Sequence, residues 1–157
     1  MLEALELIQH TEIKHTITFD SMLEYCVVYG DAQRIEQVVI NLLSNATKYS
    51  LGANSVEVKL VRDQENVTVG VRDFGPGIDP EKTNWIFTRF SGIGEVTPNI
   101  SGLGIGLYIS HEIITRHSGK IWAESEVGKG STFYFSLPLA NAAASPAFAA
   151  ATRFSSV

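Results

Sequence analysis

The alternation of apolar and polar positions divides most of the chain into short strands separated by helices. Period-two alternation predicts strands at 15–19, 26–29, 55–61, 66–73, 120–126 and 131–138. The polar run "RDQE" separates the third strand from the fourth, and Gly128 and Gly130 lie between the fifth and the sixth. Each of these two pairs is therefore predicted to form an antiparallel hairpin.

Three segments have helical periodicity instead. The longest follows Asp31, a favourable N-cap residue, and runs to about Tyr49, with Gly52 just beyond. A short helix is expected from Asp79 to about Phe87, and a third over residues 103–119. Because hairpins dominate, we predict an α+β fold. It is a two-layer α/β sandwich, in which helices pack on one face of a mixed, mostly antiparallel sheet.

Composition places the chain among ordinary globular proteins and excludes several functions. Its 157 residues are 45% hydrophobic and 18% charged, which suits a single domain with a real core. The net charge of −5 argues against binding to nucleic acid. The lone Cys26 allows no internal disulfide, and no apolar run approaches the roughly 18 residues of a membrane span. We expect a soluble, cytoplasmic domain without membrane contact.

The ends of the chain differ in character from its middle. After Pro138 the sequence becomes alanine-rich and loses its apolar period. The expected organisation is a short segment at 1–14, one domain at 15–139, and a disordered tail at 140–157.

The long helix carries an unusual polar stripe. At about 100° per residue, Gln37, Asn41, Asn45 and Lys48 fall within roughly ±40° of one direction, away from its apolar side. A solvated surface would explain this stripe equally well. A functional role requires complementary chemistry elsewhere in the chain.

Two glycine-rich segments supply that chemistry. "DFGPGID" begins with Asp73 at a strand end, where an ionised carboxylate suits an amino group such as that of adenine. "SGLGIGL" has glycines at 102, 104 and 106 directly before a helix, and such backbone can bind phosphate. Its spacing matches neither the dinucleotide-binding fingerprint nor the Walker A loop. Taken alone, each segment could be an ordinary turn.

The order of the motifs resembles the ATP-binding catalytic domain of sensor histidine kinases, within the class that has the Bergerat ATP-binding fold. "NLLSNATKYS" is similar to the N box of that family, "DFGPGI" to the G1 box, "WIFTRF" to the F box and "SGLGIGL" to the G2 box. The resemblance covers residues 15–139 and implies ATP and Mg²⁺ as cofactors. It also implies two partners: a dimerising helical hairpin that bears the phosphoacceptor histidine, and a response regulator. Because the family dimerises through that hairpin, the isolated domain is expected to be a monomer, and residues 1–14 are expected to be a remnant of the connection to the hairpin domain. The resemblance is compatible with a membrane-anchored parent protein.

The resemblance also assigns roles to individual residues. Asn41 would coordinate Mg²⁺, Asn45 would contact the phosphates, and Lys48 would balance their charge. Asp73 would accept from the adenine amino group, and Ser131 or Thr132 would complete that pocket. The other nucleotide-binding positions that it implies are Tyr49, Gly75, Gly77, Ile78, Phe87, Phe90, Gly102, Leu103, Gly104, Ile105, Gly106 and Leu107. Phe87 and Phe90 would anchor a lid from about Ser91 to Ser101.

Three departures bear on the mechanism. Gln37 stands where ATP-hydrolysing relatives of this fold have a glutamate that activates water, so hydrolysis should be poor. The lid lacks a basic residue, which makes Arg89 the candidate to reach the γ-phosphate. His111 precedes a glutamate but lacks the proline of the acceptor motif, so we interpret it as helix surface. The resemblance therefore implies a protein-histidine kinase domain that is incomplete alone. The alternatives are a catalytically silent nucleotide-binding module and an anti-sigma-type serine kinase.

Overall fold

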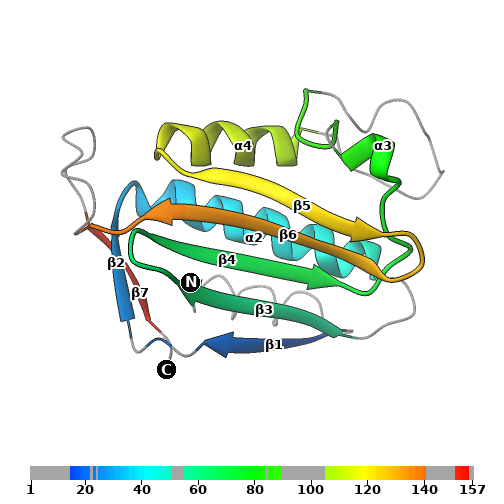
Figure 1. Ribbon diagram of the computed structural model, residues 1–157, viewed down its shortest axis with the longest axis horizontal. Helices are drawn as coiled ribbons and strands as arrows, with labels where there is room; N and C mark the ends of the chain where they lie inside the picture. The colour runs from blue at the N-terminus through cyan, green and yellow to red at the C-terminus, as the bar shows by residue number, and fades with distance from the viewer. Residues whose placement is uncertain are drawn as a thin grey trace.

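A five-stranded sheet forms the centre of the protein (Figure 1). The computed structural model describes residues 15–21, 23, 25–50, 55–83, 85–89, 105–140 and 151–155. The strand order is β1-β3-β4-β6-β5. The strands are β1 (Thr16–Ser21), β3 (Ser55–Arg62), β4 (Asn66–Asp73), β5 (Lys120–Glu126) and β6 (Gly130–Pro138). β1 pairs in parallel with β3, and the other pairs are antiparallel, which confirms the predicted mixed sheet.

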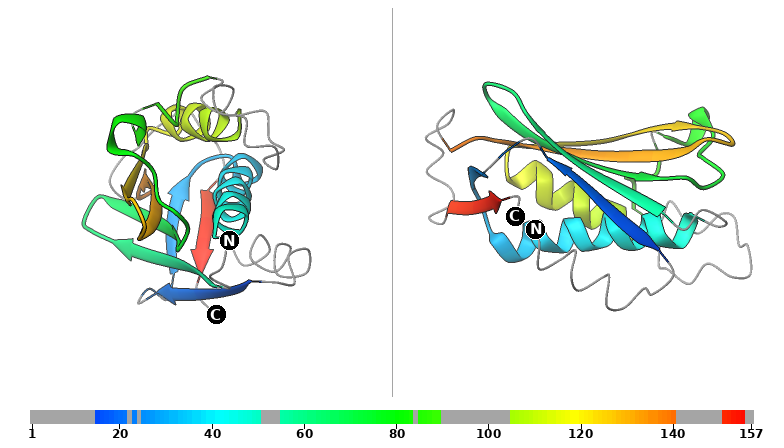
Figure 2. Two further views of the ribbon diagram at one scale, coloured as in Figure 1. Left: turned by 90° about the vertical axis from the view of Figure 1, so that its right-hand side faces the viewer. Right: turned by 90° about the horizontal axis from the view of Figure 1, so that it is seen from below.

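Two helices, α2 (Ala32–Tyr49) and α4 (Gly106–Arg116), lie together on one face of this sheet. Figure 2 shows both helices on the same side, and among the described elements no helix covers the opposite face. The core lies between the two layers and contains, among others, Val38, Leu42, Val58, Val69, Ile114 and Phe135. This arrangement confirms the predicted two-layer α+β fold. Within the described part of the chain, no helix has the length and apolarity needed to span a membrane.

Helix α2 begins and ends as its sequence predicts. Asp31 is the N-cap, and its Oδ1 accepts hydrogen bonds from Gln33 N and Arg34 N at 3.0 and 3.2 Å. At the other end, Ser50 N donates to Ala46 O, and the buried Ser50 hydroxyl accepts from Phe74 N at 3.3 Å. The end of α2 is therefore tied to the segment that follows β4.

The short helix after β4 is smaller than predicted. Helix α3 covers Pro80–Thr83, whereas the sequence suggested a helix to about Phe87. Trp85 N donates to Lys82 O and Thr88 N donates to Trp85 O, so the chain continues in three-residue turns. The prediction was wrong in length because local turns replace the second helical turn.

The alanine-rich tail also differs from its expectation. Ala151–Ser155 forms strand β7, which pairs in antiparallel fashion with β2 (Tyr25–Tyr29). The other edge of β2 contacts the end of the domain, where Ala140 N donates to Val27 O at 2.8 Å. A disordered tail is therefore wrong for these five residues. The partner edge lies far away in the sequence, so no local pattern revealed the pairing.

His117 joins the end of α4 to the start of α2. The buried ring accepts a hydrogen bond at Nε2 from Asp31 N, at 3.0 Å. Its Nδ1 lies 2.7 Å from Ile113 O. Because Nε2 is an acceptor, the proton of the neutral ring is on Nδ1, which donates to that carbonyl. The adjacent Gly30 leaves room for the ring, since a Cβ there would lie 2.6 Å from His117 Cδ2.

Candidate functional site

Three segments meet at the C-terminal half of α2: the helix itself, the loop after β4, and the first residues of α4. A Cβ on Gly75 would lie 2.2 Å from Tyr49 O, and one on Gly106 would lie 2.3 Å from Asn41 Oδ1. Real Cβ atoms do not approach so closely. At Gly75 the obstacle is backbone, so a side chain cannot fit there, whereas at Gly106 the end of the Asn41 side chain would have to move. The structure thus brings together segments from the N, G1 and G2 motifs.

Asn41 is oriented by a residue of the facing helix. Its Nδ2 donates to Ser110 Oγ at 3.0 Å, and its Oδ1 lies against Gly106. Ser110 is buried, whereas Asn41 is half-buried. The amide oxygen therefore lies at the start of α4, where the sequence predicts phosphate binding. An amide oxygen is a hard donor that suits Mg²⁺.

Further along α2, Asn45 and Lys48 are half-buried and Tyr49 is exposed. The Lys48 Nζ lies 5.7 Å from the centroid of the Tyr49 ring, which is within range of a cation–π contact. Partial burial raises the pKa of Tyr49, so its hydroxyl is neutral near pH 7. The described side chains on this face thus include one cation and two amides.

Asp73 is the buried acid of the site. Only 2% of its surface is exposed, and its Oδ1 accepts from Gly75 N at 2.9 Å and from Ser131 N at 3.2 Å. Burial raises the pKa of this carboxyl above its ordinary value, although both hydrogen bonds and the nearby Arg72 act in the opposite direction. A carboxylate held in this way presents its oxygens in a fixed direction.

The loop after Asp73 is fixed against the β5–β6 hairpin. Gly77 has φ +75°, and a Cβ there would lie 2.2 Å from Glu126 O. Ile78 N donates to Ser125 Oγ at 2.7 Å, and Gly128 N donates to Pro76 O. The Ser125 hydroxyl also lies 2.9 Å from Ser131 Oγ. This network holds the loop beside Asp73.

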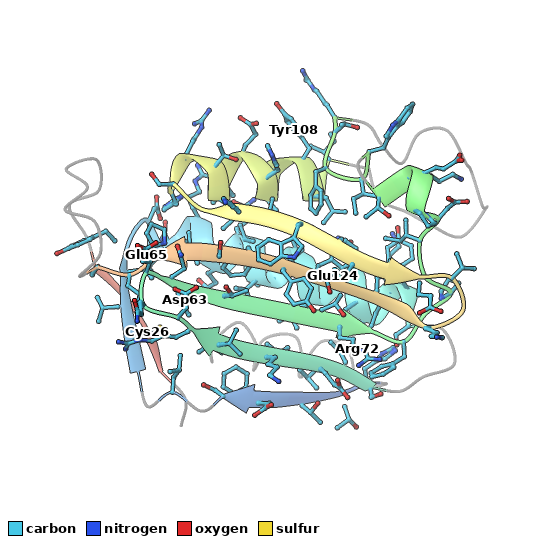
Figure 3. The ribbon with its side chains drawn as sticks, viewed as in Figure 1. Cys26, Asp63, Glu65, Arg72, Tyr108 and Glu124 are labelled. Atoms are coloured by element: carbon cyan, nitrogen blue, oxygen red, sulfur yellow. The ribbon has the colours of Figure 1, made fainter. Side chains whose placement is uncertain are left out.

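The register of β4 and β6 decides between the two hydroxyl residues at the end of β6. Asp73 pairs with Ser131, whereas Thr132 pairs with Arg72 and Glu124. Neighbouring residues of a strand point to opposite faces, so Thr132 lies on the uncovered face of the sheet. Figure 3 shows Arg72 and Glu124 on that face. The register therefore places Ser131 beside Asp73, which makes Ser131 the better candidate of the two for the pocket.

The remaining predicted residues are only partly tested. Ile78, Phe87 and Leu107 are half-buried and pack against the core. Gln37 and Arg89 are exposed, and Arg34 Nη1 donates to Gln37 Oε1 at 3.2 Å. Positions 90–104, which include Phe90, Gly102, Leu103, Gly104 and the expected lid, lie outside the described residues.

His111 lies on the surface of α4, as predicted. Its side chain is 44% exposed, and its Nδ1 lies 3.7 Å from the carboxylate of its neighbour Glu112. Its ring centroid is 6.4 Å from that of Phe87.

Sequence reasoning missed three serines of the site: Ser50, Ser110 and Ser125. Each holds a backbone or side-chain group that belongs to a predicted motif. Ser50 and Ser110 are buried, but serine is common on surfaces, so the sequence contained no signal for their burial.

Comparison with known proteins identifies the arrangement. Residues 30–141 match the family described as "Histidine kinase-, DNA gyrase B-, and HSP90-like ATPase". The chain belongs to this family. Membership confirms the predicted resemblance to the catalytic domains of sensor histidine kinases and the fold that it implied.

Individual relatives agree with this assignment. The chain is 41% identical over 127 residues to the adaptive-response sensory kinase SasA of Thermosynechococcus vestitus, which covers 80% of this chain and 33% of the relative. The catalytic domain of histidine kinase ThkA is 32% identical with a TM-score of 0.74, covering 87% of this chain and 88% of that domain. Full-length ShkA in complex with AMPPNP shares the fold, at 24% identity and a TM-score of 0.76, covering 88% and 29%. The chain thus spans about a third of the curated relative that it matches.

Proposed function

We propose that this domain binds ATP with Mg²⁺ and presents the γ-phosphoryl group to a histidine on a separate helical hairpin. A response regulator would then receive the phosphoryl group from that histidine. The observation that carries the proposal is the buried Asp73 carboxylate, which two backbone amides hold at the end of a core strand. Membership of the ATPase family supports it.

The adenine side of the proposal rests on hydrogen-bonding capacity. Both backbone amides bind Oδ1 of Asp73, so Oδ2 is the candidate acceptor for the exocyclic amino group of adenine. Gly75 and Gly77 keep the backbone free of side chains, and Ile78 offers an apolar surface for the base. Ser131, adjacent to Asp73, would support the same edge.

The phosphate side lies on α2 and at the start of α4. Lys48 would offset the negative charge of the phosphates, and Asn45 would donate to their oxygens. The residues present fit a magnesium ion, because the oxygen of the Asn41 amide lies against Gly106 while its hydrogens face Ser110. When bound, Mg²⁺ would neutralise charge on the phosphate oxygens.

Hydrolysis should be slow in this site. Gln37, one helical turn before Asn41, is an amide and cannot take a proton from water. The Gln37 side chain instead accepts a hydrogen bond from Arg34 on the exposed surface of α2. The bound triphosphate would therefore persist until an acceptor arrives.

The test supplies a helical hairpin that carries a phosphoacceptor histidine, together with ATP and Mg²⁺. Wild-type protein should form phosphohistidine on the hairpin, Asn41→Ala should not, and Ser44→Ala, an exposed change on the same helix, should behave as wild type. Nucleotide binding without any labelling would favour the silent module. Label on serine would favour the anti-sigma-type kinase, and failure to bind nucleotide would refute the proposal.

A further inference from the structure

One polar contact crosses between the two helices of the site. Asn41 on α2 and Ser110 on α4 are far apart in sequence, and Asn41 Nδ2 donates to Ser110 Oγ at 3.0 Å. Ser110 is 2% exposed, so its hydroxyl faces a protected environment in which an unmade hydrogen bond is costly. The contact sits one helical turn after Gly106, the residue that Asn41 Oδ1 touches.

The two ends of an asparagine amide are not equivalent. Oδ1 can bind a cation, whereas the NH₂ group can only donate hydrogen bonds and would repel one. A half-turn about the last side-chain bond exchanges them at little cost, because that torsion is broad. An asparagine that must bind a cation therefore needs a neighbour that accepts from its NH₂ group.

Ser110 is suited to be that neighbour. A serine hydroxyl inside a helix commonly donates to the carbonyl one turn earlier, which leaves its lone pairs for a group on another helix. Such lone pairs favour the NH₂ end of Asn41 and turn Oδ1 toward Gly106. We propose that Ser110 is a positioning residue that sets the Asn41 amide for magnesium. This inference rests on the proposed function, because it assumes that Asn41 meets Mg²⁺ there.

The first test compares ADP binding with and without Mg²⁺ by calorimetric titration. In Ser110→Ala we expect the gain in affinity due to Mg²⁺ to fall by roughly two- to tenfold, the range of one net hydrogen bond. Affinity without Mg²⁺ should stay at the wild-type value. Ser136→Ala, a change of another buried serine on β6, should alter neither quantity. We call the increase in ADP affinity on adding Mg²⁺ the magnesium gain. If this gain is the same in Ser110→Ala as in the wild type, the inference is overturned while the proposed function stays intact.

A second test separates orientation from packing. In Asn41→Asp the side chain ends in two equivalent oxygens, so orientation no longer matters. Adding Ser110→Ala to this variant should therefore leave the magnesium gain within about twofold. A loss as large as in the asparagine background would show that Ser110 acts through packing and would overturn the inference.

The third readout needs no nucleotide. The side-chain NH₂ signals of Asn41 in an amide NMR spectrum should move toward those of exposed asparagines in Ser110→Ala, and their hydrogen exchange should become faster. Unchanged signals would overturn the orienting role directly. If wild type bound ADP without any magnesium gain, the metal role in both proposals would fail, whereas a shift of the Asn41 signals would still establish the orienting contact.

Discussion

Replacing Asp73 with asparagine should separate the structural role of this residue from its role in binding. Asparagine keeps an oxygen where Asp73 Oδ1 accepts from Gly75 N and Ser131 N, at 2.9 and 3.2 Å. It replaces the other oxygen with an NH₂ group. The substitution therefore preserves the internal contacts and reverses the hydrogen-bonding capacity offered to a ligand.

The stability change is a balance of two effects. Hydrogen bonds to a charged group contribute about 1.5–3 kcal/mol and neutral ones about 0.5–1.5, so two such bonds weaken by roughly 2 kcal/mol together. The substitution also removes a buried charge, and burial is the larger influence because the pKa of Asp73 is raised despite these bonds. At neutral pH the free energy of unfolding should therefore be unchanged, within about 1 kcal/mol, or higher than in wild type.

The binding change should be larger and unfavourable. The new NH₂ group would face the amino group of adenine, and two donors cannot pair. An unsatisfied buried donor costs roughly 1–3 kcal/mol, which corresponds to about a 5- to 150-fold loss of ADP affinity.

The pH dependence of the wild type should show the same separation. Because the folded pKa of Asp73 lies above its unfolded value, its contribution to stability is complete below the unfolded pKa and is lost as the pH rises through the folded pKa. Adenine binding should instead weaken as the pH falls through the folded pKa, since the carboxylate becomes protonated. Asp73→Asn should remove both dependences.

Denaturant unfolding and ADP titration over acidic to neutral pH measure the two quantities. The matched control is Asp63→Asn in the β3–β4 turn, labelled in Figure 3. Asp63 accepts from Glu65 N and Asn66 N at 2.7 Å, and these bonds lower its pKa. The stabilising effect of Asp63 is present above its unfolded pKa and is lost as the pH falls through its folded pKa. In Asp63→Asn, ADP binding should equal that of the wild type. An Asp73→Asn protein that binds ADP normally would refute the reasoning.

Three further substitutions and one truncation test the geometry. Gly77→Ala should lower the free energy of unfolding by more than about 1 kcal/mol in denaturant titration, because its Cβ would meet Glu126 O at φ +75°. Gly128→Ala, also at positive φ but in open space, should cost less. Gly106→Ala should fold normally but lose roughly tenfold in the magnesium-dependent gain of ADP affinity, since its Cβ would displace Asn41 Oδ1. A chain ending at Ala140 lacks β7, and calorimetry should show a thermal midpoint lower by a few degrees if the pairing with β2 stabilises the domain.

Sequence patterns predicted those helices and strands that depend on residues close to one another in the chain. The N-cap at Asp31, the apolar side of α2 and the alternation in β3 and β4 are each readable within one turn or one hairpin. The parallel pairing of β1 with β3 joins strands separated by β2 and α2, and the pairing of β7 with β2 spans most of the chain. Neither leaves a signal in a short window.

The site shows the same division. The Asp73 and glycine motifs were found from their order along the chain. The choice between Ser131 and Thr132 depended on strand register, because neighbouring residues point to opposite faces. Ser110 was missed because its role exists only once α4 packs against α2.

The two hydrogen bonds of the His117 ring have a spectroscopic consequence. Its two ring nitrogens differ, since Nδ1 carries the proton toward Ile113 O and Nε2 accepts from Asp31 N. A protonated and a bare imidazole nitrogen resonate at well-separated nitrogen-15 frequencies. The nitrogen-15 signals of His117 therefore report whether the end of α4 and the start of α2 remain joined. They can be followed in nitrogen-15-enriched protein without attaching a dye or spin probe.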